Sequence, residues 1–201
     1  MSFAGSAAFA ACNGRPTRIA ADTATTTVPI TDEPRVCEPS AENIEGPFFK
    51  RGSPHRMDLT GGAALGEPLV VQGTVVDTRC LPIAGAWLEV WQADHTGQYD
   101  NEGDRFRATL DLDDDAHYRV QTIVPGRYLN GRQYRPAHIH VKAHAPGHRS
   151  LTTQLYFQGD PFNDMDPFID PSLIMSMRYE GTGGERTAVC RFDFVLEPGR
   201  P

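Results

Sequence analysis

Two histidines separated by one residue are the feature of this sequence that points most directly to chemistry. They are His138 and His140, within the stretch Tyr134–Val141 (YRPAHIHV). In an extended strand alternate side chains point to opposite faces, so Ile139 and Val141 would pack inward while both imidazoles share the other face. A strand with an ordinary polar face shows the same spacing, so the pair indicates a metal site only if further ligands accompany it.

The residues that could complete such a site decide which metal it would hold. A carboxylate would favour an open ferrous centre, and a third histidine, such as His144 on the same strand face, would favour zinc and hydrolysis. The zinc alternative is weak, because the motif contains no carboxylate that could act as a general base. The neighbouring loops offer two tyrosines instead, Tyr99 and Tyr128. Taken singly, each is more often a loop tyrosine that packs on a sheet edge.

The elements that would position these residues are short strands separated by turns. Beside the histidine strand, runs that predict strands occupy residues 69–77, 87–91, 106–112, 117–124, 151–157 and 187–196. The 19 glycines and 16 prolines are typical of an all-β chain with many turns. We therefore predict an all-β fold, a β-sandwich of mixed or antiparallel sheets with long loops around the site.

Length and charge limit the possible organisation and partners. The 201 residues suit one domain and a tail. Residues 1–36 are rich in Ala, Thr and Ser without a periodic apolar face, which predicts a disordered tail before a single domain over residues 37–201. The net charge of −7 argues against nucleic acid as a partner. No apolar run approaches the roughly 20 residues that a membrane span needs.

The N-terminus and the cysteines bear on location. Met1–Cys12 (MSFAGSAAFAAC) is similar to the end of an export signal with a lipoprotein-type cysteine, although the usual preceding basic residues are missing. We predict an exported protein, whether periplasmic, lipid-anchored or secreted, with a cytoplasmic location as the alternative. After export Cys80 could form a disulfide with Cys37 or with Cys190, or none could form, and the sequence leaves these possibilities open.

Five motifs, in order along the chain, resemble the intradiol ring-cleavage dioxygenases, the family of catechol and protocatechuate dioxygenases. They are EGPFF (45–49), VWQADHTGQYD (90–100), TIVPGRY (122–128), RPAHIH (135–140) and LTTQLYF (151–157). The resemblance covers residues 37–197. The segment before Cys37 does not resemble the helical dimerisation region of the cytosolic catechol 1,2-dioxygenases, and the Cys37–Phe49 arrangement and compact size are most similar to those of the secreted members.

The resemblance implies a mononuclear, non-haem Fe(III) centre with Tyr99, Tyr128, His138 and His140 as ligands. This donor set is chemically consistent. Tyrosinate is a hard anionic donor that stabilises ferric over ferrous iron. The metal in turn holds both phenols deprotonated at neutral pH, although a free phenol has a pKa of about 10.

The implied reaction is cleavage of a catechol-type diol by O2 to a cis,cis-muconate-type product. Tyr128 would act as a general base for the diol, Arg135 would stabilise negative charge on the ring, and Gln154 would play a similar polar role. Tyr134 could compete with Tyr128 as the tyrosinate, but its place directly before the histidine strand argues against this. The implied partners are a small-molecule catechol, O2 and, at the level of the family, a second copy in a homo-oligomer.

The sequence also leaves open which substituent the substrate carries and whether the domain has kept its catalytic activity. Catechol, hydroxyquinol, protocatechuate and lignin-derived catechols all fit, and the residues that could distinguish them are Phe48, Phe49, Arg51 and the 94–101 loop. The alternative function is a non-catalytic β-sandwich ligand-binding module that keeps the scaffold without iron.

Overall fold

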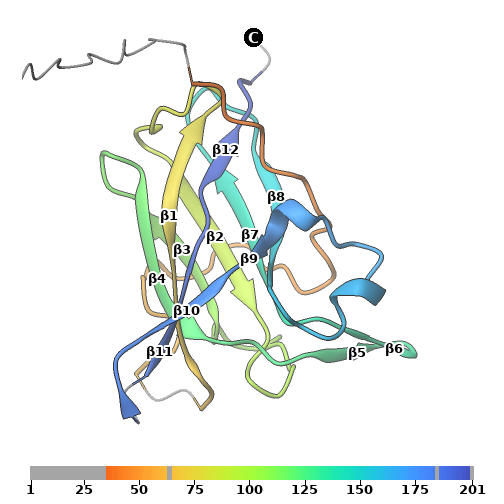
Figure 1. Cartoon of the computed structure of the whole chain (residues 1–201). Helices are drawn as coiled ribbons and strands as arrows, with labels where there is room; N and C mark the ends of the chain where they lie inside the picture. The colour runs from red at the N-terminus through yellow and green to blue at the C-terminus, as the bar shows by residue number, and fades with distance from the viewer. Residues whose placement is uncertain (1–34, 63–64, 184–185, 200–201) are drawn as a thin grey trace, which may run out of the picture. The chain divides into compact units, whose positions relative to one another are not determined.

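The computed structural model describes residues 35–62, 65–183 and 186–199, which contain two five-stranded β-sheets (Figure 1). The predicted tail and export signal fall outside these residues, apart from Arg35 and Val36. The strands are β1 (Pro68–Asp77), β2 (Trp87–Gln92), β3 (Arg107–Asp111), β4 (His117–Ile123), β5 (Tyr128–Asn130), β6 (Gln133–Arg135), β7 (His138–His144), β8 (Leu151–Phe157), β9 (Ile174–Met175), β10 (Met177–Glu180), β11 (Thr187–Arg191) and β12 (Phe194–Leu196). Two short 3-10 helices, η1 (Asn163–Met165) and η2 (Pro171–Leu173), follow β8.

The two sheets differ in their strand order and in the strands that they contain. The first has the order β10-β11-β1-β12, with β4 also paired to β1, and it mixes parallel and antiparallel neighbours. The second has the order β3-β2-β7-β8-β9 and contains the histidine strand at its centre. The two-stranded β5–β6 hairpin projects from the lower end of the second sheet (Figure 1). The predicted all-β sandwich with mixed sheets is confirmed.

The core between the sheets is built from the alternate, inward-facing residues of these strands. Leu69, Val71 and Val75 of β1 belong to the same buried cluster as Ile139 and Val141 of β7. Burying an aliphatic side chain of this size contributes about 1.5–3 kcal/mol. The inward face of β7 therefore holds the strand in place, and its other face is free for chemistry.

The last predicted strand, residues 187–196, is divided into β11 and β12. The division lies opposite Gly73, where a Cβ atom would come within 1.8 Å of the Phe192 carbonyl oxygen. Phe192 N donates to Gln72 O at 3.0 Å, and Thr74 N donates to the Asp193 carboxylate at 2.9 Å. The Asp193 carboxylate thus takes the place of one backbone acceptor between the strands. The alternating apolar pattern does not reveal this local interruption.

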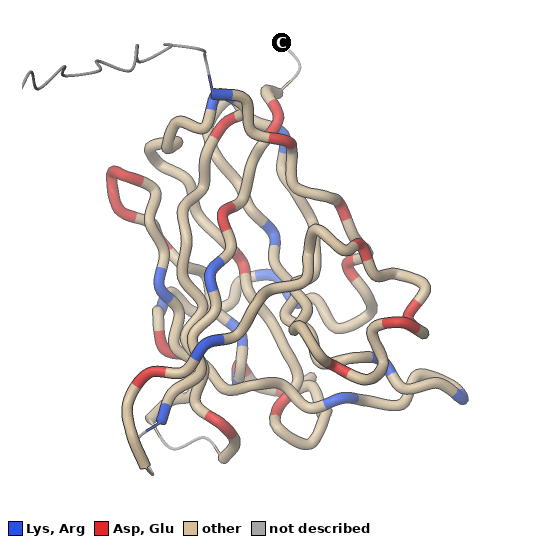
Figure 2. The backbone as a smooth tube through the Cα atoms, in the orientation of Figure 1, with Lys and Arg blue, Asp and Glu red and all other residues tan. Residues whose placement is uncertain are grey.

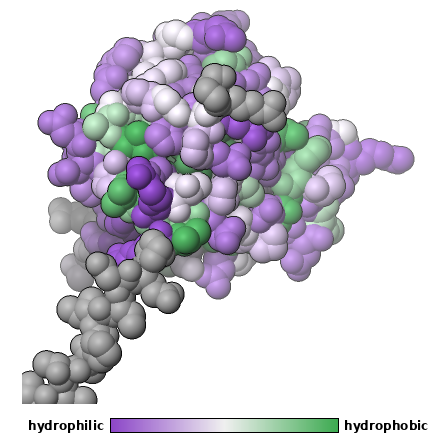
Figure 3. All heavy atoms as spheres, turned by 90° about the horizontal axis from the view of Figure 1, so that it is seen from above, coloured by the Kyte–Doolittle hydropathy of each residue, from purple (hydrophilic) through white to green (hydrophobic). Residues whose placement is uncertain are grey.

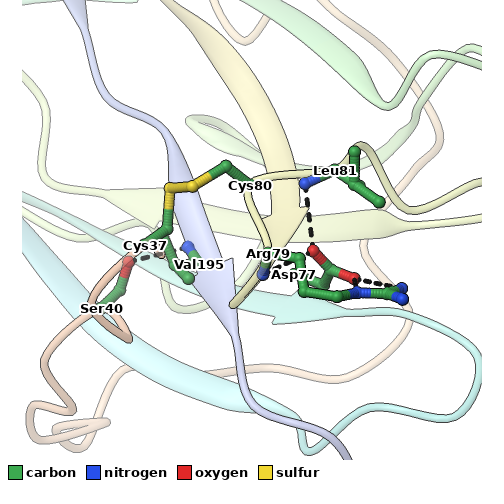
Figure 4. Close-up of a disulfide and its surroundings, with 7 residues drawn as sticks. All are labelled: Cys37, Ser40, Asp77, Arg79, Cys80, Leu81 and Val195. Atoms are coloured by element: carbon green, nitrogen blue, oxygen red, sulfur yellow. Dashed lines mark hydrogen bonds and ion pairs between the residues drawn. A yellow bond between two sulfur atoms is a disulfide. The ribbon is translucent and has the colours of Figure 1, made fainter. Parts of the chain in front are cut away.

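A disulfide joins Cys37 to Cys80, with 5.3 Å between the Cα atoms (Figure 4). Cys190 is buried and unpaired, so the alternative pairing of Cys80 with Cys190 is wrong. Beyond the disulfide, Ser40 N donates to Val195 O at 3.1 Å, and Val195 N donates to Ser40 Oγ at 2.9 Å. The disulfide thereby fixes the start of a segment that continues along the second sheet toward the histidines.

The surface of the described residues is mixed in charge and hydropathy. Acidic and basic residues are interspersed along the chain in Figure 2, and the acidic stretch 113–115 lies exposed in the connection from β3 to β4, which belong to different sheets. The face drawn in Figure 3 is mainly hydrophilic, with small hydrophobic patches. None of the described helices has the length and apolarity needed to cross a membrane.

Candidate metal centre

The β7 strand places both predicted histidines side by side on its outer face. His138 and His140 are 2% and 1% exposed, and their ring centroids lie 4.8 Å apart. Trp91, the cross-strand neighbour of His140 on β2, stacks on that imidazole at 4.8 Å with an angle of 8° between the planes. Cross-strand stacking of this kind restricts the rotation of the ring.

Two loops bring the predicted tyrosines to the same point. Tyr99 follows β2, and its hydroxyl oxygen lies 3.1 Å from His140 Nε2 and 3.4 Å from His138 Nε2. Tyr128 opens β5, and its ring centroid lies 5.7 Å from that of Tyr99 and 5.6 Å from that of His138. The structure therefore brings together all four residues that the sequence singled out as ligands.

The two tyrosine-bearing loops pack backbone against backbone through a pair of glycines. A Cβ atom at Gly97 would lie 2.3 Å from Arg127 O, and one at Gly126 would lie 2.3 Å from Gly97 N. Asp94 completes the junction, because its carbonyl accepts hydrogen bonds from both Gly97 N and Gly126 N. Its carboxylate also accepts from Gln98 N at 3.1 Å. The separation of the two tyrosines is thus set by backbone contacts that exclude any side chain.

The hydrogen bond of His138 to the backbone determines which of its ring nitrogens carries the lone pair. His138 Nδ1 lies 2.7 Å from Pro136 O, and it can only donate to that carbonyl, so the lone pair of the neutral ring is on Nε2. The Tyr99 hydroxyl has a single proton to donate, yet two Nε2 atoms lie within its reach. Two imidazole nitrogens and two phenol oxygens in this arrangement suit a hard, high-valent cation, so the donor set fits ferric iron.

Burial determines the protonation of these groups when no cation is present. Burial lowers the pKa of His138 to about 4, and the nearby positive charge of Arg135 contributes in the same direction. Burial is the main cause that lowers the pKa of His140 well below its ordinary value, and the charge interaction with His138 is the second. Burial is also the main cause that raises the pKa of Tyr99, followed by the charge interaction with Tyr128. Both imidazoles are therefore neutral and able to bind a metal at neutral pH, whereas Tyr99 needs a cation to lose its proton.

The alternative ligands are directed elsewhere. His144 Nε2 lies 3.2 Å from Glu89 Oε2, its Nδ1 lies 2.8 Å from Ser150 Oγ, and its position on β7 is about 13 Å from His140. No three His, Cys, Asp or Glu side chains gather into a metal cluster within the described residues. Tyr134 is 47% exposed and pairs with Leu129, in the cross-strand pair next to that of Tyr128 and Arg135. Adjacent pairs project on opposite faces of a hairpin, so Tyr134 faces away from the histidines.

A buried polar network adjoins the histidines and contains both predicted auxiliary residues. Arg135 is 5% exposed, and it donates to Asp166 at 2.8 Å, to Gln154 Oε1 at 3.0 Å and to Tyr156 Oη at 3.1 Å. Burial alone would lower the pKa of Arg135, but the hydrogen bond to Asp166 raises it above its ordinary value. Gln154 and Tyr156 are the cross-strand neighbours of His140 and His138. Arg135 is therefore a fixed buried cation.

The segment from the disulfide supplies the other side of the site. Phe48 stacks on Tyr99 with 4.1 Å between ring centroids, and a Cβ atom at Gly46 would lie 3.4 Å from the His140 ring. Phe49 turns away and packs on Trp91 at 4.9 Å. Of the residues predicted to sense the substrate, Phe48 thus lies at the site, whereas Phe49 packs on Trp91, behind the His140 imidazole.

Three residues of the centre are absent from the sequence-based prediction. They are Asp166, Tyr156 and Arg107, a fully buried residue that contacts both the Phe48 and the Tyr99 segments. Tyr156 had a usable signal, since it is two residues after Gln154 on a strand that pairs with the histidines. Asp166 and Arg107 carry no such local pattern.

Comparisons with known proteins agree with this geometry. A protein-family model described as "Dioxygenase" matches residues 44–198. The hydroxyquinol 1,2-dioxygenase of Nocardioides simplex is 37% identical over 187 aligned positions, and the match covers 77% of this chain and 64% of that enzyme. The chlorocatechol 1,2-dioxygenase of Rhodococcus opacus is 32% identical over 185 aligned positions, with coverage of 77% of this chain and 71% of that enzyme. The chain thus spans about two thirds of these curated relatives.

Solved structures show the same fold. The dioxygenase domain of a dioxygenase carbohydrate-binding protein fusion from Streptomyces sp. SirexAA-E has a TM-score of 0.71 and 41% identity, over 81% of this chain and 100% of that one. The 3-chlorocatechol 1,2-dioxygenase of Rhodococcus opacus 1CP has a TM-score of 0.74 and 28% identity, over 80% and 73%. With its family match, its relatives and its clustered tyrosines and histidines, the chain belongs to the intradiol ring-cleavage dioxygenase family.

Proposed function

We propose that this protein cleaves a catechol-type aromatic diol between its hydroxyl-bearing carbons, using O2 and a mononuclear non-haem Fe(III), to give a cis,cis-muconate-type product. The observation that carries the proposal is the convergence of Tyr99, Tyr128, His138 and His140, with two Nε2 atoms within 3.4 Å of one phenol oxygen. These four residues would hold the metal. When bound, ferric iron would chelate the diol and make its ring reactive toward O2.

Tyr128 is the residue that we assign as general base. It lies at the first position of β5, at the end of a loop, whereas Tyr99 is stacked under Phe48 and contacts both histidines. Tyr128 is therefore the less constrained of the two phenols. When deprotonated, its oxygen can accept one of the two hydroxyl protons of an incoming diol, which leaves the substrate as a monoanion.

Arg135 and Gln154 would stabilise the negative charge that this deprotonation creates. The guanidinium is held from one side by Asp166, so its position and charge are preorganised before the substrate arrives. The Gln154 amide donates to Ile44 O at 2.7 Å and accepts from Arg135, which fixes its orientation. A buried, prealigned cation is more effective than a solvated one, because it needs no reorganisation during the reaction.

The relatives support a proposal for the substrate class. Their names include hydroxyquinol, chlorocatechol and catechol 1,2-dioxygenases, all of which act on a benzene ring with adjacent hydroxyls. We propose the same class of diol here and assign no particular substituent.

The visible absorption spectrum of the iron-loaded protein, before and after anaerobic addition of catechol, tests the proposal. We expect a broad tyrosinate-to-iron band that moves to longer wavelength with catechol. We also expect Tyr128→Phe and His138→Ala to abolish turnover while the protein stays folded. Full activity of either variant would refute the assignment. A wild-type protein that stays colourless after iron loading would instead favour the non-catalytic binding module.

We further propose that the protein is exported. The Cys37–Cys80 disulfide supports this, because such bonds persist in oxidising compartments and are rare in the cytosol. Thiol labelling of the native protein without reductant should modify neither cysteine, and the mature chain should begin after the first dozen residues. Free thiols at both positions, with an intact Met1, would argue for the cytoplasmic alternative.

A further inference from the structure

Arg107 is a charged residue in the interior whose role the proposed reaction does not explain. It is 1% exposed, although a buried charge is costly unless its donors are satisfied. The hydrogen-bond partners of its guanidinium among the described residues are all backbone carbonyl oxygens. Its Nε and one terminal nitrogen donate to Asp100 O at 3.1 and 2.9 Å, and the other terminal nitrogen donates to Phe48 O at 2.6 Å.

These two carbonyls belong to the two segments that form one wall of the metal centre. Asp100 directly follows Tyr99 in the chain. Phe48 is the residue whose ring stacks on Tyr99 at 4.1 Å. A single guanidinium therefore connects the backbone of Asp100, the residue after a proposed ligand, to the backbone of Phe48, which lies 59 positions before Arg107 in the sequence.

The position of Arg107 in the sheet explains how it reaches this wall. It pairs with Trp91 across β2–β3, Trp91 pairs with His140 across β2–β7, and His140 pairs with Gln154. Residues in one cross-strand row share a face of the sheet, so Arg107 projects on the same side as His140. The preceding residue, Phe106, is buried and has a φ of +53°, a left-handed conformation that costs a non-glycine residue free energy.

We propose that Arg107 is a positioning residue that clamps the Tyr99 loop to the Phe48 segment and so sets the geometry of the Tyr99 ligand. The proposal rests on the proposed function, since it concerns the same centre. A planar guanidinium can donate to both carbonyls at once, in a fixed fork. A lysine ammonium at this position would keep the charge but could not reproduce that fork.

Hydrogen exchange of the metal-free protein is the first test, because it does not depend on iron or activity. In Arg107→Lys we expect faster exchange, by about tenfold, in peptides that cover residues 46–50 and 99–104 together, with β1 and β8 unchanged. The matched control is Lys50→Met. Lys50 connects the same segments from the surface through Gly103 O at 2.7 Å, and its side chain is 35% exposed, so we expect little change there.

Spectroscopy of the iron-loaded variants is the second test. Arg107→Lys should shift the tyrosinate-to-iron band and lower kcat by about tenfold or more with a smaller change in KM, as expected for a misplaced ligand. A purely structural role would lower the thermal midpoint and leave the band of the folded fraction unchanged.

The outcomes separate the two proposals. Unchanged exchange in both segments, or exchange that rises in only one, would overturn the clamp whether or not the protein binds iron. A colourless wild-type protein would overturn the proposed function, and the exchange result would still decide the clamp. Arg107→Met serves as the stronger perturbation, and Arg107→Lys decides the question if Arg107→Met fails to fold.

Discussion

At the scale of single residues, the centre depends on side chains whose partners are distant in sequence. Arg135 and Asp166 are 31 residues apart, and both side chains are almost fully buried, at 6% and 1% exposure. Removing one member of a buried pair leaves an uncompensated charge, which costs far more than breaking a pair in water.

We therefore expect Asp166→Asn to lower the free energy of unfolding by about 3 kcal/mol. Urea denaturation of the metal-free protein measures it. The control is Glu180→Gln, which breaks the exposed pair of Arg178 and Glu180 at 2.8 Å and should cost under about 1 kcal/mol. Equal costs for the two variants would show that Arg135 is solvated in the folded protein.

The pKa of His138 predicts how the stability of the metal-free protein depends on pH. Its folded value of about 4 lies below the ordinary value of 6.5, so the unfolded chain binds the proton more readily. Stability is complete above about pH 6.5 and is lost as the pH falls toward 4. Urea midpoints across this range should decline more steeply for the wild type than for His138→Gln, and equal slopes would contradict the assignment.

The sequence was informative about those residues whose neighbours form a recognisable motif. His138, His140, Tyr99 and Tyr128 could be selected because each belongs to such a stretch. Arg107 could not, because its partners are carbonyl oxygens, which every residue has. Asp166 could not either, since only the folded chain places it beside Arg135.

At the scale of elements, the junction of the Tyr99 and Tyr128 loops is the most demanding part of the fold. A methyl group at Gly126 would lie 2.3 Å from Gly97 N and 2.6 Å from His95 O. The atoms in the way belong to the backbone, so a side chain at Gly126 could be accommodated only if one of the two loops moved.

We expect Gly126→Ala to separate the two loops, with loss of most iron binding and activity. Metal content and the visible band measure the effect. Gly131→Asn is the control, because Gly131 has a φ of +66° that asparagine tolerates, and a Cβ atom there meets nothing within 4 Å. Full colour in Gly126→Ala would mean that the tyrosines are not held by this junction.

The strands themselves were predictable where the alternation is regular. Residues 151–157 and 69–77 agree with β8 and β1 to within one residue. The β5–β6 hairpin was missed, because its six residues are mostly exposed and lack an apolar face. The division at Phe192 was missed because it depends on the close approach of Gly73, which lies on another strand.

At the scale of the whole molecule, the disulfide connects residues that are 43 positions apart. Closing a loop of this length restricts the unfolded chain and contributes about 4 kcal/mol to stability in the chain-entropy model. We expect Cys37→Ser/Cys80→Ser to unfold at lower urea and yet to retain the visible band and kcat, because Asn43 N→Thr152 O and other backbone bonds still hold the segment. Loss of the band in the folded variant would show that the disulfide also shapes the site.

The order of the strands is the part of the fold that composition could not predict. The sequence indicates many short strands, but the parallel pairing of β1 with both β11 and β12 joins the two ends of the domain. Such pairings depend on the simultaneous packing of both sheets, and no local signal encodes them.

The two faces of β7 have a consequence for how this protein can change over generations. Ile139, Val141 and Ala143 belong to the core, while His138 and His140, which alternate with Ile139 and Val141 along the strand, belong to the centre. Selection for heat resistance can therefore act on one set while the other stays constant, provided that the side-chain volume of the core is conserved. An insertion or deletion of one residue in the strand would exchange the two sets and destroy both at once. Within β7, descendants of this gene should therefore vary by substitution only. Insertions and deletions should accumulate in the β7–β8 turn instead.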